Sequence, residues 1–404
     1  MTKAADVVMV GGGVIGLASA WESATRGASV CVVDPDPGHG ASWAAAGMLA
    51  PVNETTFGEE PLVRLLLDAA ACWPDFAERL GAATGVDVGF RRCGTVVVAL
   101  DASDRAAIDR VLEFQRRLDL PASRLSASEC RALVPALTPG VRGGAHVPGD
   151  HQVDNRRLVA ALLRACEAAA VQVVRSRVGA VRVGPAGDVT GVVLEDTTPI
   201  AASTVVVAAG AESAALGGVP NGVLPPVRPV KGHILRLRGD PARPLLERTV
   251  RGLVHGHPCY LVPRADGSLV VGATSEERGF DRSVQAGAVH ALLDDARALV
   301  PGVDELELVE CVAGLRPGSP DNRPFVGMTS LAGLAVATGH YRNGILLAPL
   351  TAAAVAALVT GEHAGPLAEG APHNPGLSPF DAFPPDRLSF TVGACRAPQP
   401  GQVQ

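Results

Sequence analysis

The sequence predicts an α/β fold in which a parallel-sheet domain is interleaved with a second, mixed-sheet domain of α+β type. Residues 7–34 have the pattern of a strand, a glycine-rich turn, a helix and a second strand, which is how a parallel sheet begins. Residues 61–149 contain helices and a strand without that alternation. Buried-strand patterns return at 204–210 and 334–339. We therefore expect each domain to be assembled from separated segments.

Composition limits the class of protein. With 404 residues, 47% of them hydrophobic, the chain can bury a large core and form two domains. A net charge of −6 gives no indication of a nucleic-acid partner. The apolar stretch 345–360 is shorter than a membrane span and is interrupted by Pro349, so we expect a soluble, cytoplasmic protein. The eight cysteines show no C-x-x-C pair and no zinc spacing, which predicts reduced thiols and no metal site.

The glycine-rich turn has the G-x-G-x-x-G spacing of dinucleotide-binding domains. Gly11 permits the tight turn, Gly13 lets the backbone approach a pyrophosphate, and Gly16 lets the helix pack closely on the strand. The helix that starts with Val14 and Ile15 presents backbone N–H groups to the phosphates. The turn therefore predicts a phosphate-binding site at the start of the first helix.

An acidic residue and a run of small residues follow the second strand. Asp34 lies about 20 residues beyond the glycines, where a carboxylate accepts hydrogen bonds from a ribose. These features predict dinucleotide binding, and the alternative is a tight turn in an unrelated α/β domain. The small residues at 42–51 suit a backbone lying against a flat ring system. The alternative is a plain alanine helix, which Gly47 and Pro51 disfavour.

Local patterns predict several elements outside this region. Amphipathic periodicity predicts helices at 61–83 and 283–300, the second with Val284 among its apolar positions. Ser126-Ala127-Ser128-Glu129 is a capping box that opens a short helix. Apolar runs on both sides of Ala265-Asp266-Gly267 predict a β-hairpin.

Four stretches resemble the family of FAD-dependent amine and amino-acid oxidases, which includes D-amino-acid oxidase and sarcosine oxidase. They are Gly11–Gly16 with Asp34, Ala41–Pro51, Ala313–Gly318 and Gly339–Pro349. The resemblance spans residues 5–360, and within the family it is closest to glycine oxidase of bacterial thiamine biosynthesis.

The resemblance implies FAD as the cofactor, held between a Rossmann-like domain and a mixed-sheet substrate-binding domain. It predicts an FAD-binding domain at 1–60, 150–220 and 312–365, a substrate-binding domain at 61–149 and 221–311, and a C-terminal tail at 366–404.

The resemblance also implies which residues contact the FAD. The segment around the start of the last helix matches the part near the pyrimidine ring, where N–H groups at a helix start stabilise the negative charge of a reduced flavin. The matching positions are Gly11, Gly13, Val14, Ile15, Gly16, Asp34, Ser42, Ala45, Ala46, Gly47, Met48, Val178, Ala209, Gly210, Arg316, His340, Arg342, Asn343, Gly344, Ile345 and Leu346.

Four residues match the substrate site of the family. Arg316 matches the arginine that binds the substrate carboxylate, which a guanidinium can hold through two parallel hydrogen bonds. Tyr260 matches a tyrosine that donates to the same carboxylate. Arg342 matches a second active-site arginine, and Met48 matches a residue on the pocket wall. For each arginine, the alternative is a surface or domain-bridging ion pair.

The resemblance implies oxidative deamination of a small amino acid, with glycine the first candidate. Hydride passes from Cα to flavin N5 and oxygen accepts the electrons, which yields imine or glyoxylate, ammonia and hydrogen peroxide, in a pathway to the thiazole of thiamine. Sarcosine or a small D-amino acid is an alternative substrate. A dehydrogenase with another acceptor and a flavin-carrying scaffold without amine chemistry are alternative functions. A thiazole synthase and a second copy of the chain are the expected protein partners.

Overall fold

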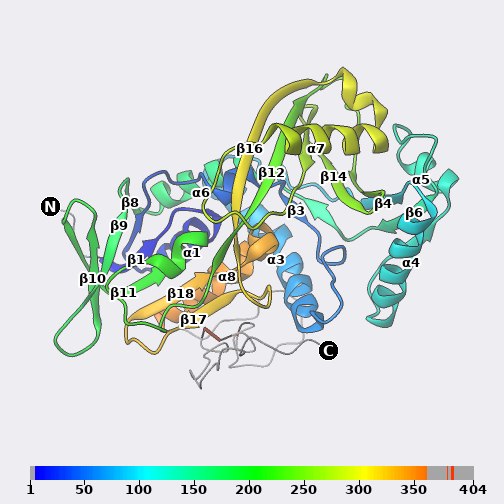
Figure 1. Ribbon diagram of the computed structural model, residues 1–404. Helices are drawn as coiled ribbons and strands as arrows, with labels where there is room; N and C mark the ends of the chain where they lie inside the picture. Colours follow the sequence, from blue (N-terminus) through cyan, green and yellow to red (C-terminus); the bar gives the residue numbers. More distant parts are fainter. Residues whose placement is uncertain (1–4, 362–379, 381–383, 386–404) are drawn as a thin grey trace, which may run out of the picture.

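The computed structural model describes residues 5–361, 380 and 384–385. Two eight-stranded sheets organise the chain, and a short pair joins β3 (Met48–Leu49) to β7 (His151–Gln152). In Figure 1 the first sheet lies at the lower left and the second at the upper right. The predicted tail at 366–404 lies outside the described residues except for Phe380, which is buried in the first core, and residues 384–385.

The first sheet has a parallel centre, as the sequence predicts. Its order is β17-β18-β11-β1-β2-β8, parallel from β18 to β8 and antiparallel between β17 and β18. Continuous apolar runs form these strands because both faces are covered. The strands are β1 (Ala5–Val10), β2 (Val30–Val33), β8 (Gln172–Val174), β11 (Pro199–Val207), β17 (Phe325–Met328) and β18 (Leu334–Thr338).

Alternate residues of each central strand enter two different cores. Val7 and Met9 of β1 pack in the core that contains the helices, whereas Val8 and Val10 pack in the core beneath an antiparallel hairpin. The helices are α1 (Val14–Thr25), α3 (Glu60–Thr84), α6 (Asn155–Ala168) and α8 (Gly344–Thr360), and the hairpin strands are β9 (Val178–Val183) and β10 (Val189–Leu194). The sheet is therefore the middle of three layers.

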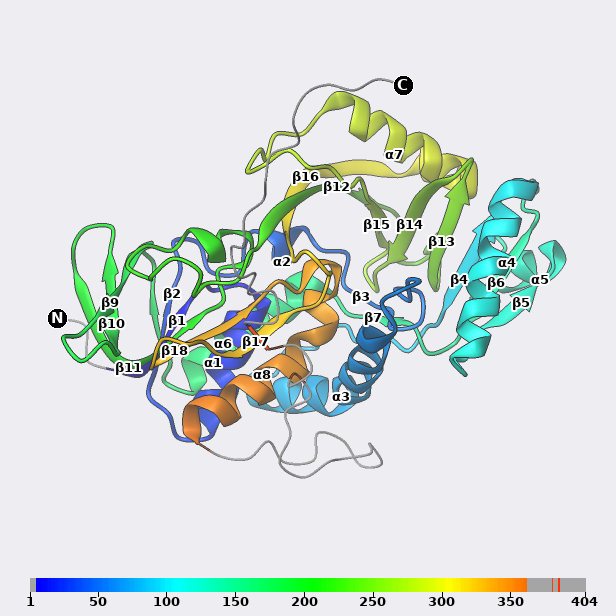
Figure 2. The same ribbon diagram turned by 60° about the horizontal axis from the view of Figure 1, so that its bottom comes forward.

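The second sheet has the order β16-β12-β15-β14-β13-β4-β6-β5 and is antiparallel except where β4 runs parallel to β13. Helix α7 packs on its apolar face, and α4 and α5 cover the end that contains β4 to β6 (Figure 2). The elements are β4 (Thr95–Ala99), α4 (Ala102–Arg117), β5 (Ser123–Leu125), α5 (Ala127–Leu133), β6 (Gly143–Val147), β12 (Arg228–Arg238), β13 (Thr249–Val254), β14 (His257–Pro263), β15 (Ser268–Gly272), α7 (Ala286–Leu299) and β16 (Glu307–Gly318).

The domain limits remain a prediction. The segments predicted for the substrate-binding domain supply β4 to β6 and β12 to β15, all of which lie in the second sheet. Strand β16 crosses the predicted limit between residues 311 and 312 and pairs with β12 along its whole length. We therefore propose that the two domains are joined through this continuous strand.

Local predictions are confirmed where short-range chemistry decides the structure. Ser126 and Glu129 form both hydrogen bonds of the capping box, and β14 and β15 form the predicted hairpin. The placement of Val284 on a helix is wrong, because α7 starts only at Ala286 and Val284 is 41% exposed in the preceding loop. Side-chain bonds hold that loop: Asp281 accepts from the backbone N–H of Ser283 at 2.9 Å.

Helix α8 with its preceding turn, Tyr341–Thr360, is long and apolar enough to be a candidate membrane span. Within the described residues it is the only such helix, and 78% of its most apolar window is buried inside the protein. Its neighbours are α1 and α3. This burial is that of a core helix.

Candidate active site between the two sheets

A cavity of about 1390 Å³ is lined by residues of both sheets and by the loops between them. The turn after β1, the end of β2 and the turn after β11 contribute to one part of its wall, and β12, β14 and β16 contribute to another. All the predicted site residues line this cavity except Gly16 and Leu346. Such a cavity at the carboxyl ends of parallel strands is where α/β folds bind ligands.

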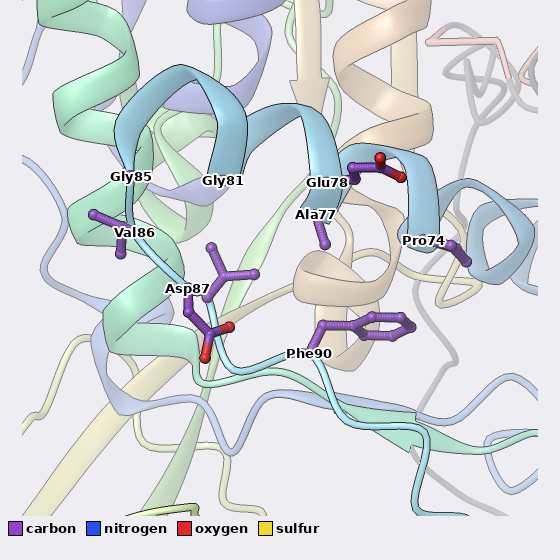
Figure 3. Close-up of a pocket in the computed structure, with 9 residues that line it drawn as sticks. Pro74, Ala77, Glu78, Gly81, Gly85, Val86, Asp87 and Phe90 are labelled. Atoms are coloured by element: carbon purple, nitrogen blue, oxygen red, sulfur yellow. The ribbon is translucent and has the colours of Figure 1, made fainter.

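A smaller hollow of about 470 Å³ lies beside the C-terminal end of α3, between Pro74 and Phe90 (Figure 3). Its only charged side chains are Glu78 and Asp87, and it has no basic or hydroxyl group among its lining residues. It therefore lacks a converging set of hydrogen-bond donors, and the larger cavity is the candidate site.

The glycine turn has the close packing that its spacing predicts. A Cβ on Gly16 would lie 1.9 Å from the carbonyl oxygen of Gly11, so Gly16 serves helix packing and does not face the cavity. Gly13 lines the cavity, and a Cβ there would lie 3.2 Å from Ser42 Oγ. The backbone N–H of Val14 donates to the same Ser42 Oγ at 2.9 Å. The turn thus presents bare backbone at Gly13, which fits the close approach of a phosphate.

Asp34 is held by the backbone on the cavity wall. Its Oδ2 accepts from the N–H of Gly12, and its Oδ1 accepts from the N–H of Asp36, both at 2.7 Å. A carboxylate oxygen can accept more than one hydrogen bond. Asp34 therefore has acceptor capacity left for ribose hydroxyls.

The run of small residues after Asp34 is not an alanine helix. Helix α2 (Ala41–Ala44) lasts one turn, and the chain becomes extended at Ala45. Gly47 has φ +70°, and a Cβ there would lie 2.0 Å from the carbonyl oxygen of Val153. Ser42 and Ala44 to Met48 line the cavity, so the end of α2 and the extended backbone after it form one wall.

Two arginines hold that wall: Arg264, which is buried and directly follows β14, and Arg236, which is half-buried on β12. Arg264 Nη2 donates to the carbonyl oxygen of Ala46 at 2.6 Å, and Arg236 Nη2 donates to that of Ala45 at 3.4 Å. Asn155, the first residue of α6, donates through Nδ2 to the carbonyl oxygen of Ser42 at 2.8 Å. The available signal was an arginine inside or directly after an apolar strand, Arg236 within β12 and Arg264 after β14, because a cation buried there needs acceptors.

The segment before α8 forms another part of the cavity wall. His340 is buried, and its Nε2 lies 3.0 Å from Thr351 Oγ1. Burial lowers the pKa of His340 to about 3, so the ring is neutral at physiological pH. Gly344 and Ile345 line the cavity at the first turn of the helix, whose N–H groups lack intrahelical partners. Leu346 has its side chain in the core, and its carbonyl oxygen accepts from Trp73 Nε1 at 2.9 Å.

Arg316 on β16 and Tyr260 on β14 both line the cavity, and β12 and β15 lie between their strands in the second sheet. Nη1 of Arg316 donates to the carbonyl oxygens of Thr274 at 3.1 Å and Lys231 at 3.4 Å. No Asp or Glu within the described part of the chain forms an ion pair with Arg316. Burial raises the pKa of Tyr260, while the charge of Arg316 opposes that rise, so the hydroxyl remains a donor at neutral pH. This pair can bind an anion.

Arg342 lines the cavity and forms an ion pair, as its alternative interpretation predicted. Its Nε lies 2.9 Å from Glu54 Oε2, and Arg251 Nη1 lies 2.8 Å from Glu54 Oε1. Burial would raise the pKa of Glu54, but the two arginines lower it to about 2. Neither Glu54 nor Arg251 could be recognised from the sequence, because the turn after β3 and the strand β13 carry no motif.

Comparison with known proteins agrees with this geometry. The profile of the FAD dependent oxidoreductase family matches residues 6–358. Glycine oxidase from Geobacillus kaustophilus is 39% identical over 364 residues, which are 89% of this chain and 94% of that protein. The bifunctional protein ThiO/ThiG of Trichormus variabilis is 35% identical over 90% of this chain, which spans only 54% of that protein.

Solved structures show the same arrangement. The crystal structure of glycine oxidase from Geobacillus kaustophilus aligns with a TM-score of 0.84 at 37% identity, covering 96% of this chain and 99% of that one. The structure of iminodiacetate oxidase from Chelativorans sp. BNC1 aligns with a TM-score of 0.79 at 28% identity, covering 94% and 98%. The cavity, its glycine turn and these similarities together show that the chain belongs to the FAD dependent oxidoreductase family, with FAD as its cofactor.

Proposed function

We propose that this enzyme oxidises glycine to the imine, which water converts to glyoxylate and ammonia. The observation that carries the proposal is Arg316, a cation on the cavity wall whose described hydrogen bonds go only to backbone carbonyl groups. The likeness to glycine oxidase over most of the chain supports the choice of substrate. With oxygen as acceptor, glycine, oxygen and water give glyoxylate, ammonia and hydrogen peroxide.

The chain binds and orients the substrate. Arg316 holds both carboxylate oxygens, and the Tyr260 hydroxyl donates to one of them. Met48 and Ala46 belong to the same apolar cluster as Tyr260, and we propose that they limit the size of the substrate side chain. The charges of Arg316, Arg251 and Arg342 exceed that of Glu54, so they favour loss of a proton from the substrate ammonium.

When bound, FAD would supply the two-electron redox chemistry for oxidation at the substrate Cα. The residues along the cavity would hold the cofactor: Gly13, Val14 and Asp34 its ADP half, Ala45 to Met48 its ring, and Gly344 and Ile345 its pyrimidine part. Neutral His340 is not required as a base, because orientation of the Cα–H bond provides much of the rate.

The test is anaerobic addition of glycine to the purified holoenzyme. We expect the visible flavin absorbance to bleach with glycine and more slowly with sarcosine and D-alanine. Absence of bleaching with all three would refute an amino-acid oxidation. Arg316→Lys keeps the charge but loses the two-pronged geometry, and we expect its apparent affinity for glycine to fall by about tenfold or more while FAD stays bound.

The acceptor is tested by turnover in air against turnover with an artificial electron acceptor. We propose oxygen, so peroxide should form in proportion to glyoxylate. Faster turnover with the artificial acceptor and no peroxide would identify a dehydrogenase instead.

We further propose a cytoplasmic role in making the thiazole of thiamine. The support is the ThiO/ThiG protein, in which a segment similar to this chain is fused to a second part. A separate thiazole synthase is then the expected partner, and co-elution of the two purified proteins would support this. Growth of a deletion strain without thiamine or its thiazole precursor would argue against the role.

A further inference from the structure

Glu54 holds two arginines on the cavity wall beside Tyr260. Its Oε1 accepts from Arg251 Nη1 at 2.8 Å, and its Oε2 accepts from Arg342 Nε at 2.9 Å. The Glu54 side chain is only 11% exposed, so water and salt screen these ion pairs weakly. One carboxylate therefore occupies two guanidinium groups of the site.

A fixed backbone turn positions Glu54. Buried Asp150 accepts from the N–H groups of Val52 at 3.0 Å and Asn53 at 2.9 Å, and from Asn53 Nδ2 at 2.7 Å. The N–H of Glu54 itself donates to the carbonyl oxygen of Ala50 at 3.0 Å. Because three bonds from one carboxylate hold the turn, Glu54 projects from a rigid support.

The sheet register places Arg251 next to the proposed carboxylate site. Arg251 on β13 is the direct partner of Tyr260 on β14. Side chains of such partners stand about 5 Å apart on one face of a sheet. A small substrate bound at Tyr260 and Arg316 that carries a second carboxylate would bring that group toward Arg251, where Glu54 already lies.

We propose that Glu54 sets the charge selectivity of the site, admitting amino acids with one carboxylate and rejecting those with a second acidic group. The inference rests on the proposed function, which makes Arg316 and Tyr260 the first carboxylate site. Glu54 repels a second anion and also occupies the cations that would bind it. The similar iminodiacetate oxidase is named for a diacid, so this fold can accommodate one in that enzyme.

The test uses two ether analogues that lack the amine and are not oxidised. Methoxyacetate has one carboxylate, and diglycolate is the same skeleton with a second. Their dissociation constants are measured on the holoenzyme from changes in the flavin spectrum. We expect the wild type to bind diglycolate about tenfold more weakly than methoxyacetate. In Glu54→Gln, diglycolate affinity should rise about tenfold or more while methoxyacetate affinity changes less than about threefold.

The matched control is Glu60→Gln, which removes the same charge from an exposed position in the first turn of α3. It should leave both dissociation constants unchanged. In Glu54→Gln combined with Arg251→Gln, the affinity gained for diglycolate should disappear. An equal change for both ligands in Glu54→Gln, the same gain in Glu60→Gln, or tighter binding of diglycolate than of methoxyacetate by the wild type would overturn the proposal.

Arg251→Gln alone covers the case in which Glu54→Gln does not retain FAD. This substitution leaves Glu54 with one partner fewer, so the affinity for diglycolate should fall about threefold more than the affinity for methoxyacetate. An equal fall in both affinities would refute the role of Glu54. The binding measurements need no turnover and are independent of the oxidase assay. Failure of glycine, sarcosine and D-alanine to bleach the flavin would refute the function, whereas glycine oxidation with unchanged ligand preference in Glu54→Gln would refute only the selectivity.

Discussion

At the residue scale, the guanidinium of Arg316 lies over Gly232, where a side chain has no room. A Cβ on Gly232 would lie 2.2 Å from Arg316 Nη1. In Gly232→Ala the flexible end of the arginine should move, so the apparent affinity for glycine should fall by on the order of tenfold. The free energy of unfolding should change by less than about 1 kcal/mol, since no backbone atom is displaced.

Gly287→Ala is the control for that substitution, because nothing lies within 4 Å of a Cβ at Gly287. Steady-state kinetics of both variants measure the apparent affinity for glycine, and thermal unfolding measures their stability. Unchanged affinity in Gly232→Ala would show that the position of Arg316 does not limit substrate binding.

The titration of Glu54 makes a second prediction at this scale. The Glu54 pKa is lowered in the folded protein from 4.5 to about 2, so the group stabilises the fold above pH 4.5 and this contribution is lost as the pH falls toward 2. The difference corresponds to roughly 3 kcal/mol. Denaturant unfolding at several acidic pH values should therefore show that the free energy of unfolding falls less with decreasing pH in Glu54→Gln than in the wild type.

Asp150 titrates in the opposite direction, because burial raises its pKa to about 6 and its contribution is lost as the pH rises. Asp150 is present in both the wild type and Glu54→Gln, so the difference between their pH profiles reports the titration of Glu54. Parallel pH profiles of the two proteins would contradict the role of the two arginines in lowering the Glu54 pKa.

At the element scale, the two glycines at the start of α1, Gly13 and Gly16, have different roles. A methyl group at Gly16 would overlap the carbonyl oxygen of Gly11, which is backbone and cannot move cheaply. Gly16→Ala should therefore lower the free energy of unfolding of the apoprotein by about 2–4 kcal/mol. A methyl group at Gly13 would instead meet only Ser42 Oγ at 3.2 Å and occupy the cavity.

Gly13→Ala should thus keep most of the apoprotein stability and lose FAD. The ratio of flavin to protein absorbance after purification measures the second effect, and denaturant unfolding of the apoprotein measures the first. These separate roles of Gly13 and Gly16 would be contradicted if the Gly13→Ala apoprotein lost as much free energy of unfolding as Gly16→Ala. They would also be contradicted if Gly13→Ala bound FAD like the wild type.

The elements that the sequence predicts well are those determined by near neighbours. The glycine turn, the capping box at Ser126 and the β14–β15 hairpin each depend on residues a few positions apart. The start of α7 was misplaced because Val284 fits the helical period, whereas the loop is held by Lys231, whose Nζ binds Asp281 Oδ2 at 2.7 Å. That partner lies 50 residues away and has no local signal.

At the scale of the whole molecule, Arg264 joins the second sheet to the cavity wall beside the first. Its side chain is 4% exposed and donates to Gln152 Oε1 at 2.8 Å and to the carbonyl oxygen of Ala46 at 2.6 Å. Arg264→Leu leaves these buried acceptors without their donor, which should cost about 3 kcal/mol of stability. Because Ala46 lines the cavity, FAD should also dissociate more readily.

Arg297→Leu provides the comparison, since the Arg297–Asp294 pair is more than half exposed at both ends. Its effect on stability should stay within about 0.5 kcal/mol. Chemical unfolding and flavin release on dilution report the two quantities. A similar small effect for Arg264→Leu would mean that other contacts fix the wall.

Assembly of the cavity from distant segments explains what the sequence did not reveal. Arg251 reaches Tyr260 only through the pairing of β13 with β14, and Glu54 meets Arg342 across 288 residues. The family resemblance supplied Arg316 and Tyr260 because motifs mark them. It could not supply Glu54, whose importance comes from the register of a sheet to which it does not belong.

Strand β12 serves both the mouth and the interior of the cavity. Lys231 binds Asp281 and Gln285, which lie next in sequence to the exposed lining residues Phe280 and Arg282 or close to them, while the next residue, Gly232, lies under the guanidinium of Arg316. We infer that a shift of the loop around Asp281 would be transmitted through Lys231 to the strand beneath Arg316, the residue proposed to bind the substrate carboxylate. On the proposed function, the entry of a substrate and its binding at Arg316 would depend on the same strand, so a substitution in β12 away from the flavin would alter both steps together.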